Sequence, residues 1–105
     1  MRVGLISDTH GYLDPRALAA LAGVDVILHA GDVGSPAIIE ALSTIAPVHA
    51  VRGNNDEKLG GLGLPFALDL TLEGHSIHLI HQIADARPGP ETRAVVAGHS
   101  HRAVV

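Results

Sequence analysis

The architecture of this chain follows from residues 3–32, which read VGLISDTHGYLDPRALAALAGVDVILHAGD. The apolar run at residues 3–7 has no polar alternation, which predicts a β-strand buried on both faces. Residues 14–23 open with Asp-Pro and close with Gly, the start and stop signals of a helix. A second apolar run at residues 24–29 predicts another buried strand. Together these segments predict two parallel strands joined by a right-handed helical crossover.

The same pattern repeats once and then changes. A Ser-Pro pair starts a second predicted helix at residues 35–45, and residues 47–51 predict a third strand. Residues 53–64 contain four glycines and predict a loop. Alternating apolar residues at 66–72, a Glu-Gly turn and a return strand at 76–80 predict a β-hairpin.

The last part of the chain adds one more strand. Residues 85–92 are polar and rich in proline, which predicts a loop or a short helix. Residues 94–97 form a last apolar run. The chain is therefore expected to be one α/β domain, residues 1–105, with parallel strands in its first half and antiparallel pairing in its second.

The composition excludes several classes of protein. Hydrophobic residues make up 47% of the chain and aromatic residues 2%, so we expect an ordered domain with an aliphatic core. Cysteine is absent, which excludes disulfides, thiolate metal sites and cysteine nucleophiles. The net charge is −4 and no run of five basic residues occurs, which argues against a nucleic-acid partner. No apolar segment approaches the ~20 residues of a membrane helix or forms a signal peptide, so we expect a cytoplasmic protein without a membrane partner.

Metal-binding side chains follow five of the predicted strands. Ligands of open α/β sheets bind beyond the carboxyl ends of the strands, so we expect these side chains to converge. Carboxylate, amide and imidazole groups without thiolate suit ions such as Mn²⁺, Fe²⁺ or Zn²⁺. So many ligands exceed the needs of one four-coordinate ion and suit two ions that share a carboxylate, for which Asp32 is the natural bridge. The candidate ligands are Asp8, His10, Asp32, Asn54, His81, His99 and His101.

The motifs resemble those of the calcineurin-like metallophosphoesterases. Their order along the chain is the one found in that family: Asp8-x-His10, Gly31-Asp32, Gly53-Asn54-x-Asp56, His81 and Gly98-His99-x-His101. The small bacterial and archaeal phosphodiesterase branch is most similar, and the retromer subunit with the same fold is a relative. The resemblance covers residues 1 to about 101 and implies a four-layer αββα sandwich with mixed sheets.

The resemblance also implies roles for these residues. One ion would be held by Asp8, His10, Asp32 and His101, and the other by Asp32, Asn54, His81 and His99. Asp56 would orient or electrostatically support its loop. A hydroxide between the two ions would attack phosphorus in line, so the implied substrate is a small phosphodiester or phosphomonoester. Mn²⁺ is the expected metal, with Fe, Ni or Zn as alternatives.

The chain departs from the family pattern in three places. Asn55 stands where many members carry a histidine that protonates the leaving group. The segment from His81 to His99 is short, so the helix usually found there is expected to be missing or disordered. The sequence also stops at Val105, where relatives continue through further strands. We therefore expect a truncated fold whose open sheet needs a missing C-terminal segment or a partner chain, such as a second copy, to cover it.

Each motif also has an interpretation without chemistry. Asp8 and Asp32 could cap the helices that follow them, and Asn54 to Asp56 could be a simple turn. Arg52 is interpreted as a residue of a surface salt bridge rather than a phosphate contact. The remaining histidines are interpreted as core, outer-shell or surface residues: His29, His49, His75 and His78.

Two rival functions stay open at this point. The same fold serves as a non-catalytic scaffold in the retromer subunit, and an incomplete chain would be an inactive fragment. The glycine-rich residues 60–63 add no third alternative, because they lack the Lys-Ser/Thr pair of a phosphate-binding P-loop. The full set of ligands favours a metal-dependent phosphoesterase.

Overall fold

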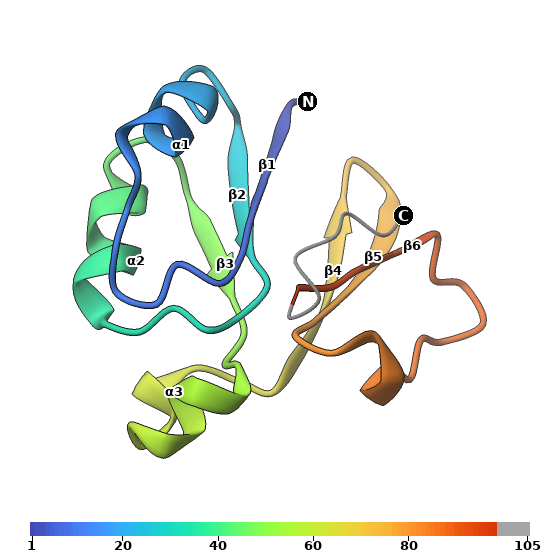
Figure 1. Ribbon diagram of the computed structural model, residues 1–105. Coiled ribbons are helices and arrows are strands. Elements are labelled where there is room, and N and C mark those ends of the chain that lie inside the picture. The colour runs from blue at the N-terminus through green and yellow to red at the C-terminus, as the bar shows by residue number, and fades with distance from the viewer. Residues whose placement is uncertain (99–105) are drawn as a thin grey trace.

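The computed structural model describes residues 1–98, which form two three-stranded sheets (Figure 1). The first sheet contains β1 (Val3–Ile6), β2 (Val26–His29) and β3 (Val48–Ala50), all parallel. Helix α1 (Pro15–Ala20) connects β1 to β2, and helix α2 (Pro36–Ser43) connects β2 to β3. The repeated strand–helix–strand pattern predicted from the sequence is confirmed.

Both helices begin where the local sequence predicts. Asp14 caps α1 and Ser35 caps α2, each by accepting a hydrogen bond from a backbone N–H of the first turn, at 2.8 and 3.2 Å. Proline follows each cap. Because these two residues fill the cap positions, the alternative that Asp8 and Asp32 cap the helices is wrong.

The two helices cover one face of the first sheet. Burying an aliphatic side chain there stabilises the fold by about 1.5–3 kcal/mol. In residues 1–98 no helix has the length and apolar character needed to cross a membrane. The core between helices and sheet contains Leu21, Ile27, Val33, Ile38, Leu42 and Ala46.

The second sheet is built on a hairpin. Strands β4 (Ala67–Leu72) and β5 (His75–Ile80) pair antiparallel, and β6 (Ala94–Val96) pairs parallel to β5. The turn residues Glu73 and Gly74 have φ angles of 47° and 80°, as a tight turn between twisted strands requires. The predicted hairpin and last strand are confirmed.

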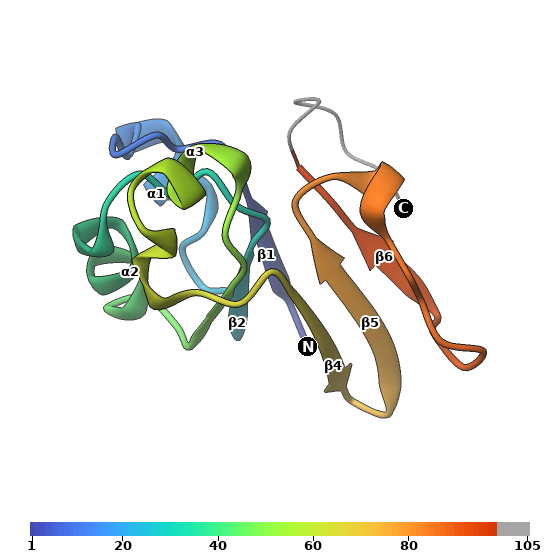
Figure 2. The same ribbon diagram turned by 90° about the horizontal axis from the view of Figure 1, so that it is seen from below.

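The two sheets pack face to face, and Figure 2 shows the resulting order of layers. Helices α1 and α2 are followed by the parallel sheet and then by the mixed sheet, which makes three layers of the expected αββα sandwich. Alternate residues of β4 and β5 face the first sheet. The core between the sheets contains Val26, Leu28, Ala30, Val51 and Leu79, with Leu68, Leu70, Leu72, Ile77 and Val96 packed against it.

Residues 83–93 lie on the outer side of the second sheet, where a fourth, helical layer is expected. The buried ring of His78 holds this segment, because Arg87 N–H donates to Nε2 at 3.3 Å while Nδ1 lies 2.8 Å from Asp69 Oδ1. The segment forms only a short 3-10 turn, η2 (Ile83–Asp85), and the Pro-Gly-Pro sequence that follows cannot continue a helix. Between His81 and Gly98 the structure contains no α-helix, in agreement with the expectation that the helix is missing here.

Residues 53–64 differ from the predicted loop. They contain helix α3 (Asn54–Lys58) and a 3-10 turn, η1 (Gly61–Gly63). Asp56 sits at the third helical position and accepts a hydrogen bond from Gly53 N–H at 3.0 Å, which caps the helix. Asparagine and glycine are poor helix formers, so local propensity does not predict this helix.

Strand β1 corrects another expectation. It was predicted to be buried on both faces, but Val3 is 37% and Leu5 53% exposed. β1 is an edge strand of the first sheet, and neither side chain belongs to the core between the sheets. Gly4 faces the helices and is buried against Leu21. Hydrophobicity alone therefore does not distinguish an edge strand from a central one.

Candidate metal centre

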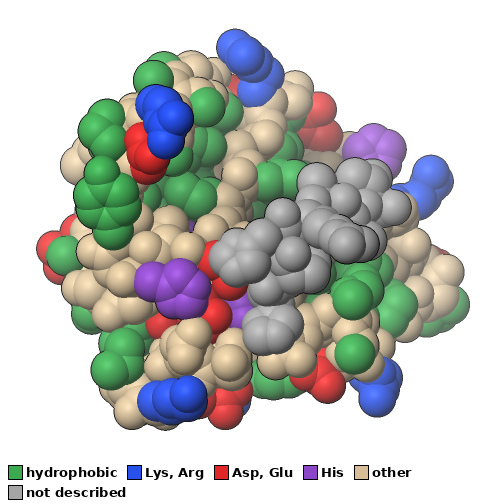
Figure 3. All heavy atoms as spheres, in the orientation of Figure 1, with side chains coloured by type: hydrophobic (Ala, Val, Ile, Leu, Met, Phe, Trp, Pro, Cys, Tyr) green, Lys and Arg blue, Asp and Glu red, His purple; other side chains and the backbone are tan. Residues whose placement is uncertain are grey.

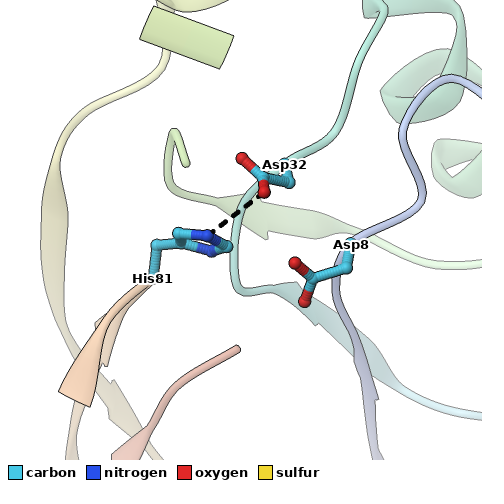
Figure 4. Close-up of side chains that lie close together, drawn as sticks. All are labelled: Asp8, Asp32 and His81. Atoms are coloured by element: carbon cyan, nitrogen blue, oxygen red, sulfur yellow. Dashed lines mark ion pairs between the residues drawn. The ribbon is translucent and has the colours of Figure 1, made fainter. Parts of the chain in front are cut away.

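Three strand ends meet at one end of the two sheets (Figure 4). Asp8 follows β1, Asp32 follows β2, and His81 follows β5. One ligand atom of each residue lies within 4.8 Å of those of the other two. Each of the three side chains is 3% exposed. The structure therefore brings these three predicted site residues together, although they are far apart in the sequence.

The ring of His81 shows what this cluster can bind. Its Nδ1 lies 2.7 Å from the carbonyl oxygen of Ala30, which only accepts hydrogen bonds, so Nδ1 carries a proton. In the neutral ring Nε2 then offers a lone pair. Nε2 lies 3.1 Å from Asn54 Oδ1 and 3.3 Å from Asp32 Oδ2, which are also electron-pair donors. Either a second proton on His81 or a metal ion would satisfy these three atoms, so the donor set fits a cation.

The carboxylate of Asp32 lies between two histidines. Its Oδ2 atom is 3.3 Å from His81 Nε2 and 3.9 Å from His10 Nε2. Asn55 donates twice to the same carboxylate, from its backbone N–H to Oδ1 at 2.9 Å and from its side-chain amide to Oδ2 at 3.1 Å. Asn55 therefore orients Asp32, a contact that the sequence did not indicate.

His10 lies on the open side of the cluster. Its Nε2 is 4.0 Å from Asp8 Oδ1, and its side chain is 46% exposed. The space-filling view shows histidine and acidic side chains next to one another on this face of the molecule (Figure 3). His10 is therefore the solvent-exposed side chain next to the buried carboxylates of Asp8 and Asp32.

The backbone at the cluster is unusual. Asp8, His10 and Asp32 have φ angles of 57°, 49° and 56°, in the left-handed region that residues other than glycine rarely adopt. Each such residue costs roughly 1–2 kcal/mol, and strain of this kind gathers at functional sites. Two backbone bonds hold the segments in place, from Asp8 N–H to the Gly31 carbonyl at 2.8 Å and from His10 N–H to the Asp32 carbonyl at 2.9 Å.

Two glycines allow the close approach of these segments, for different reasons. Gly31 has a φ of 100°, so it provides a tight turn before Asp32. Gly53 has an extended backbone with φ of −98°, which any residue can adopt, so its conformation does not require glycine. A Cβ atom on Gly53 would overlap the carboxylate of Asp32. Gly53 is therefore required by contact and not by conformation.

Asp56 does not join the metal cluster. Its fully buried carboxylate accepts hydrogen bonds from the backbone N–H groups of Gly53 at 3.0 Å, Val33 at 2.9 Å and Gly34 at 2.8 Å. Burial raises the pKa of Asp56, but these three donors and nearby His29 outweigh it, so the pKa lies below its ordinary value. Asp56 thus ties the segment after β2 to the segment after β3, as a residue that supports its loop would.

His29 is buried directly behind the cluster. Its ring is 0% exposed, with Nε2 3.0 Å from Thr9 Oγ1 and Nδ1 accepting a hydrogen bond from Gly31 N–H at 3.1 Å. Burial lowers the pKa of His29 from 6.5 to about 4, although the nearby carboxylates oppose this. His29 is therefore a buried residue next to the cluster, a position that fits both the core and the outer-shell interpretation.

The buried state of His29 predicts a pH-dependent stability. Between pH 6.5 and pH 4 the unfolded chain binds a proton at His29 that the folded chain does not, so the free energy of unfolding falls as the pH falls through this window. The loss should be on the order of 3 kcal/mol. Urea unfolding with excess chelator at several pH values measures it, and His29→Asn should flatten the slope. An equal slope in both proteins would contradict the assignment.

The other residues with open interpretations lie outside the cluster. His78 is buried on the outer face of the second sheet, His49 is half-buried, and His75 is exposed. The Nε atom of Arg52 is 3.8 Å from Glu57 Oε1, as expected of a residue in a surface salt bridge. Its guanidinium group also donates a hydrogen bond to the Leu64 carbonyl at 3.1 Å.

Two predicted ligands, His99 and His101, lie outside the described residues. The residue before them, Gly98, is buried and donates a hydrogen bond to the carbonyl of His81 at 2.9 Å. A Cβ atom on Gly98 would lie 3.0 Å from Asp8 Oδ2. The chain therefore reaches the cluster at Gly98.

Comparison with known proteins defines the class. The domain model of the calcineurin-like phosphoesterase superfamily matches residues 1–105, and the chain belongs to this family. The family resemblance inferred from the motifs is thereby confirmed. Phosphoester hydrolysis and the binding of divalent metal are the general properties that membership implies.

Individual proteins agree with this assignment. The chain is 32% identical over 119 residues to a protein named probable metallophosphoesterase from Methanothermobacter thermautotrophicus, covering 97% of this chain and 67% of that one. It is 28% identical to the structure of YfcE, a phosphoesterase from E. coli, with a TM-score of 0.66, covering 96% of this chain and 70% of that one. Vps29 of Chaetomium thermophilum shares the fold at 20% identity, with a TM-score of 0.74 over 95% of this chain.

The lengths of these proteins differ from that of this chain. The chain spans 67% of the archaeal protein and 60% of the Vps29 structure. The archaeal alignment is also longer than this whole chain of 105 residues, so that protein has additional residues inside the aligned region.

Proposed function

We propose that this chain is a metal-dependent hydrolase of phosphodiesters or phosphomonoesters that works at a centre of two divalent ions. The observation that supports this best is the position of Asp32 Oδ2 between His81 and His10, at 3.3 and 3.9 Å from their Nε2 atoms. A carboxylate oxygen that lies within 4 Å of two imidazoles suits a ligand shared by two ions.

Each ion would have its own set of residues around this shared carboxylate. Asp8 and His10 would complete one set together with His101, and Asn54 and His81 would complete the other together with His99. The donors are oxygen and imidazole nitrogen, which fit Mn²⁺ first and Fe, Ni or Zn as alternatives. When bound, the two ions would polarise the phosphoryl oxygens and activate a water molecule as the nucleophile.

The protein residues would do the remaining work. Without cations, Asp8 and Asp32 would repel the phosphate of a substrate, so the two carboxylates make catalysis depend on metal. Asn55 would keep Asp32 oriented through its two hydrogen bonds. Its amide cannot protonate a leaving group, so substrates with good leaving groups should react fastest.

The proposal predicts that metal and activity go together. Protein prepared with added Mn²⁺ should contain close to two ions per chain by elemental analysis and should hydrolyse bis(p-nitrophenyl) phosphate. Excess chelator should abolish this hydrolysis, and added Mn²⁺ should restore it, because the metal ions offset the repulsion between the phosphate and the carboxylates of Asp8 and Asp32. A folded chain that binds no metal and hydrolyses neither this diester nor p-nitrophenyl phosphate would instead fit the scaffold alternative.

A further inference from the structure

A buried chain of hydrogen bonds connects the two segments that carry the candidate ligands. Thr9 lies between Asp8 and His10, and its hydroxyl donates to the carbonyl of Val33 at 2.9 Å. The same hydroxyl lies 3.0 Å from His29 Nε2. The other ring nitrogen of His29, Nδ1, accepts from Gly31 N–H at 3.1 Å. The chain thus runs from Gly31 through His29 and Thr9 to Val33, on both sides of Asp32.

The protons along this chain can be assigned without conflict. The Gly31 N–H can only donate, so His29 Nδ1 must accept. In the neutral ring the proton is then on Nε2, which donates to Thr9 Oγ1. The Thr9 hydroxyl is left to donate its own proton to the carbonyl of Val33. The low pKa of His29, about 4, keeps the ring in this neutral form near pH 7.

The chain of bonds holds a strained part of the backbone. Asp8 and His10, on either side of Thr9, have left-handed φ angles of 57° and 49°, and Asp32 has 56°. Each residue would lose this strain by relaxing to an ordinary conformation. The backbone bonds from Asp8 and His10 to the other segment resist this relaxation. The hydrogen bond from the Thr9 hydroxyl to the Val33 carbonyl adds a side-chain link to these backbone bonds.

We propose that Thr9 and His29 are positioning residues of the metal centre: their hydrogen bonds hold Asp8 and Asp32 so that both carboxylates face the same point. This inference rests on the proposed function. Neither Thr9 nor His29 belongs to the cluster of candidate ligands. Their effect is to maintain the geometry of the ligands before an ion arrives, so their loss should weaken metal binding.

Another buried histidine provides a matched comparison. His78 also uses both ring nitrogens, one with Asp69 and one with Arg87 N–H, and it is 4% exposed. Its partners belong to the outer side of the second sheet and not to the ligand segments. His78→Asn should therefore lower the free energy of unfolding and leave the affinity for metal unchanged, whereas His29→Asn should weaken metal binding.

The decisive variant is Thr9→Val, which keeps the shape of the side chain and removes the hydroxyl. Isothermal titration with Mn²⁺ should show an affinity about 10–100-fold weaker than that of the wild type. Thr9→Ser keeps the hydroxyl and should restore the affinity to within about threefold. The double variant with His29→Asn should be no weaker than the weaker single variant, because both changes break one chain of bonds.

The outcomes separate this inference from the proposed function. If the wild type binds no Mn²⁺, the proposed function is wrong and this inference falls with it. If the wild type binds Mn²⁺ and Thr9→Val binds it equally well, only the inference is overturned. A second test uses only the wild-type protein and so does not depend on whether a variant folds. It is a long-range proton–nitrogen NMR spectrum of the histidine rings. It should show the His29 proton on Nε2, and a proton on Nδ1 would overturn the inference.

Discussion

Asp32→Asn should nearly abolish phosphoester hydrolysis, with kcat/KM reduced by at least about 10³-fold. The Oδ2 atom of Asp32 faces both His81 and His10, so the substitution removes a charged ligand from both proposed ions. Metal ions stabilise the transition state by several kcal/mol. Because about 1.4 kcal/mol corresponds to a tenfold change in rate, the loss of this stabilisation accounts for a reduction of about 10³-fold. Steady-state kinetics on bis(p-nitrophenyl) phosphate with saturating Mn²⁺ measures the effect.

Asn54→Ala is the comparison that tests whether Asp32 is shared by the two proposed ions. Asn54 is neutral and lies on the His81 side, so its loss should weaken one ion and reduce the rate by only about 10–100-fold. Elemental analysis should then find close to one ion per chain, against nearly none in Asp32→Asn. Equal residual rates and equal metal content in the two variants would show that Asp32 is not shared.

Asp56→Asn should lower the free energy of unfolding by about 2–5 kcal/mol, a large part of the stability of a small domain. Its Oδ2 accepts from Val33 and Gly53 N–H, and its Oδ1 accepts from Gly34 N–H. An amide presents a single oxygen, so at least one buried N–H would face an NH₂ group. Urea unfolding of the metal-free protein at pH 7 measures the loss.

A matched variant and the pH dependence make this test specific. Asp25→Asn removes a carboxylate that also accepts a backbone N–H, from Arg2 at 2.7 Å, but at an exposed position, so it should cost less than about 1 kcal/mol. Because the pKa of Asp56 is lowered on folding, its contribution is present above pH 3.8 and is lost as the pH falls through the lower folded pKa. Similar losses in the two variants at pH 7 would contradict the role given to Asp56.

The sequence by itself determined the elements whose signals are local. The Asp-Pro and Ser-Pro pairs start helices because the cap and the N–H it accepts from are two residues apart in the chain. The Glu-Gly turn predicts its hairpin for the same reason. Helix α3 was missed because its capping residue, Asp56, is also held by Val33 and Gly34, which local propensity cannot include.

The approximate location of the site was also available from the sequence. Metal-binding side chains follow the strands, and parallel strands end at one edge of a sheet, so Asp8 and Asp32 had to lie near each other. His81 comes from the second sheet, and only the packing of the two sheets brings its ring to Asp32. The order of the motifs therefore predicted the members of the cluster but not the contacts between their atoms.

Only the tertiary structure decided how the ligands are held. The contacts of Asn55 with Asp32, of Asp56 with Val33 and of Thr9 with His29 join residues 20 or 23 positions apart. No sequence spacing encodes such contacts, because they depend on how far each segment turns after its strand. The left-handed backbone of Asp8, His10 and Asp32 sets those turns. That backbone is unfavourable in isolation, so it exists only where the packed fold and its buried hydrogen bonds outweigh its strain.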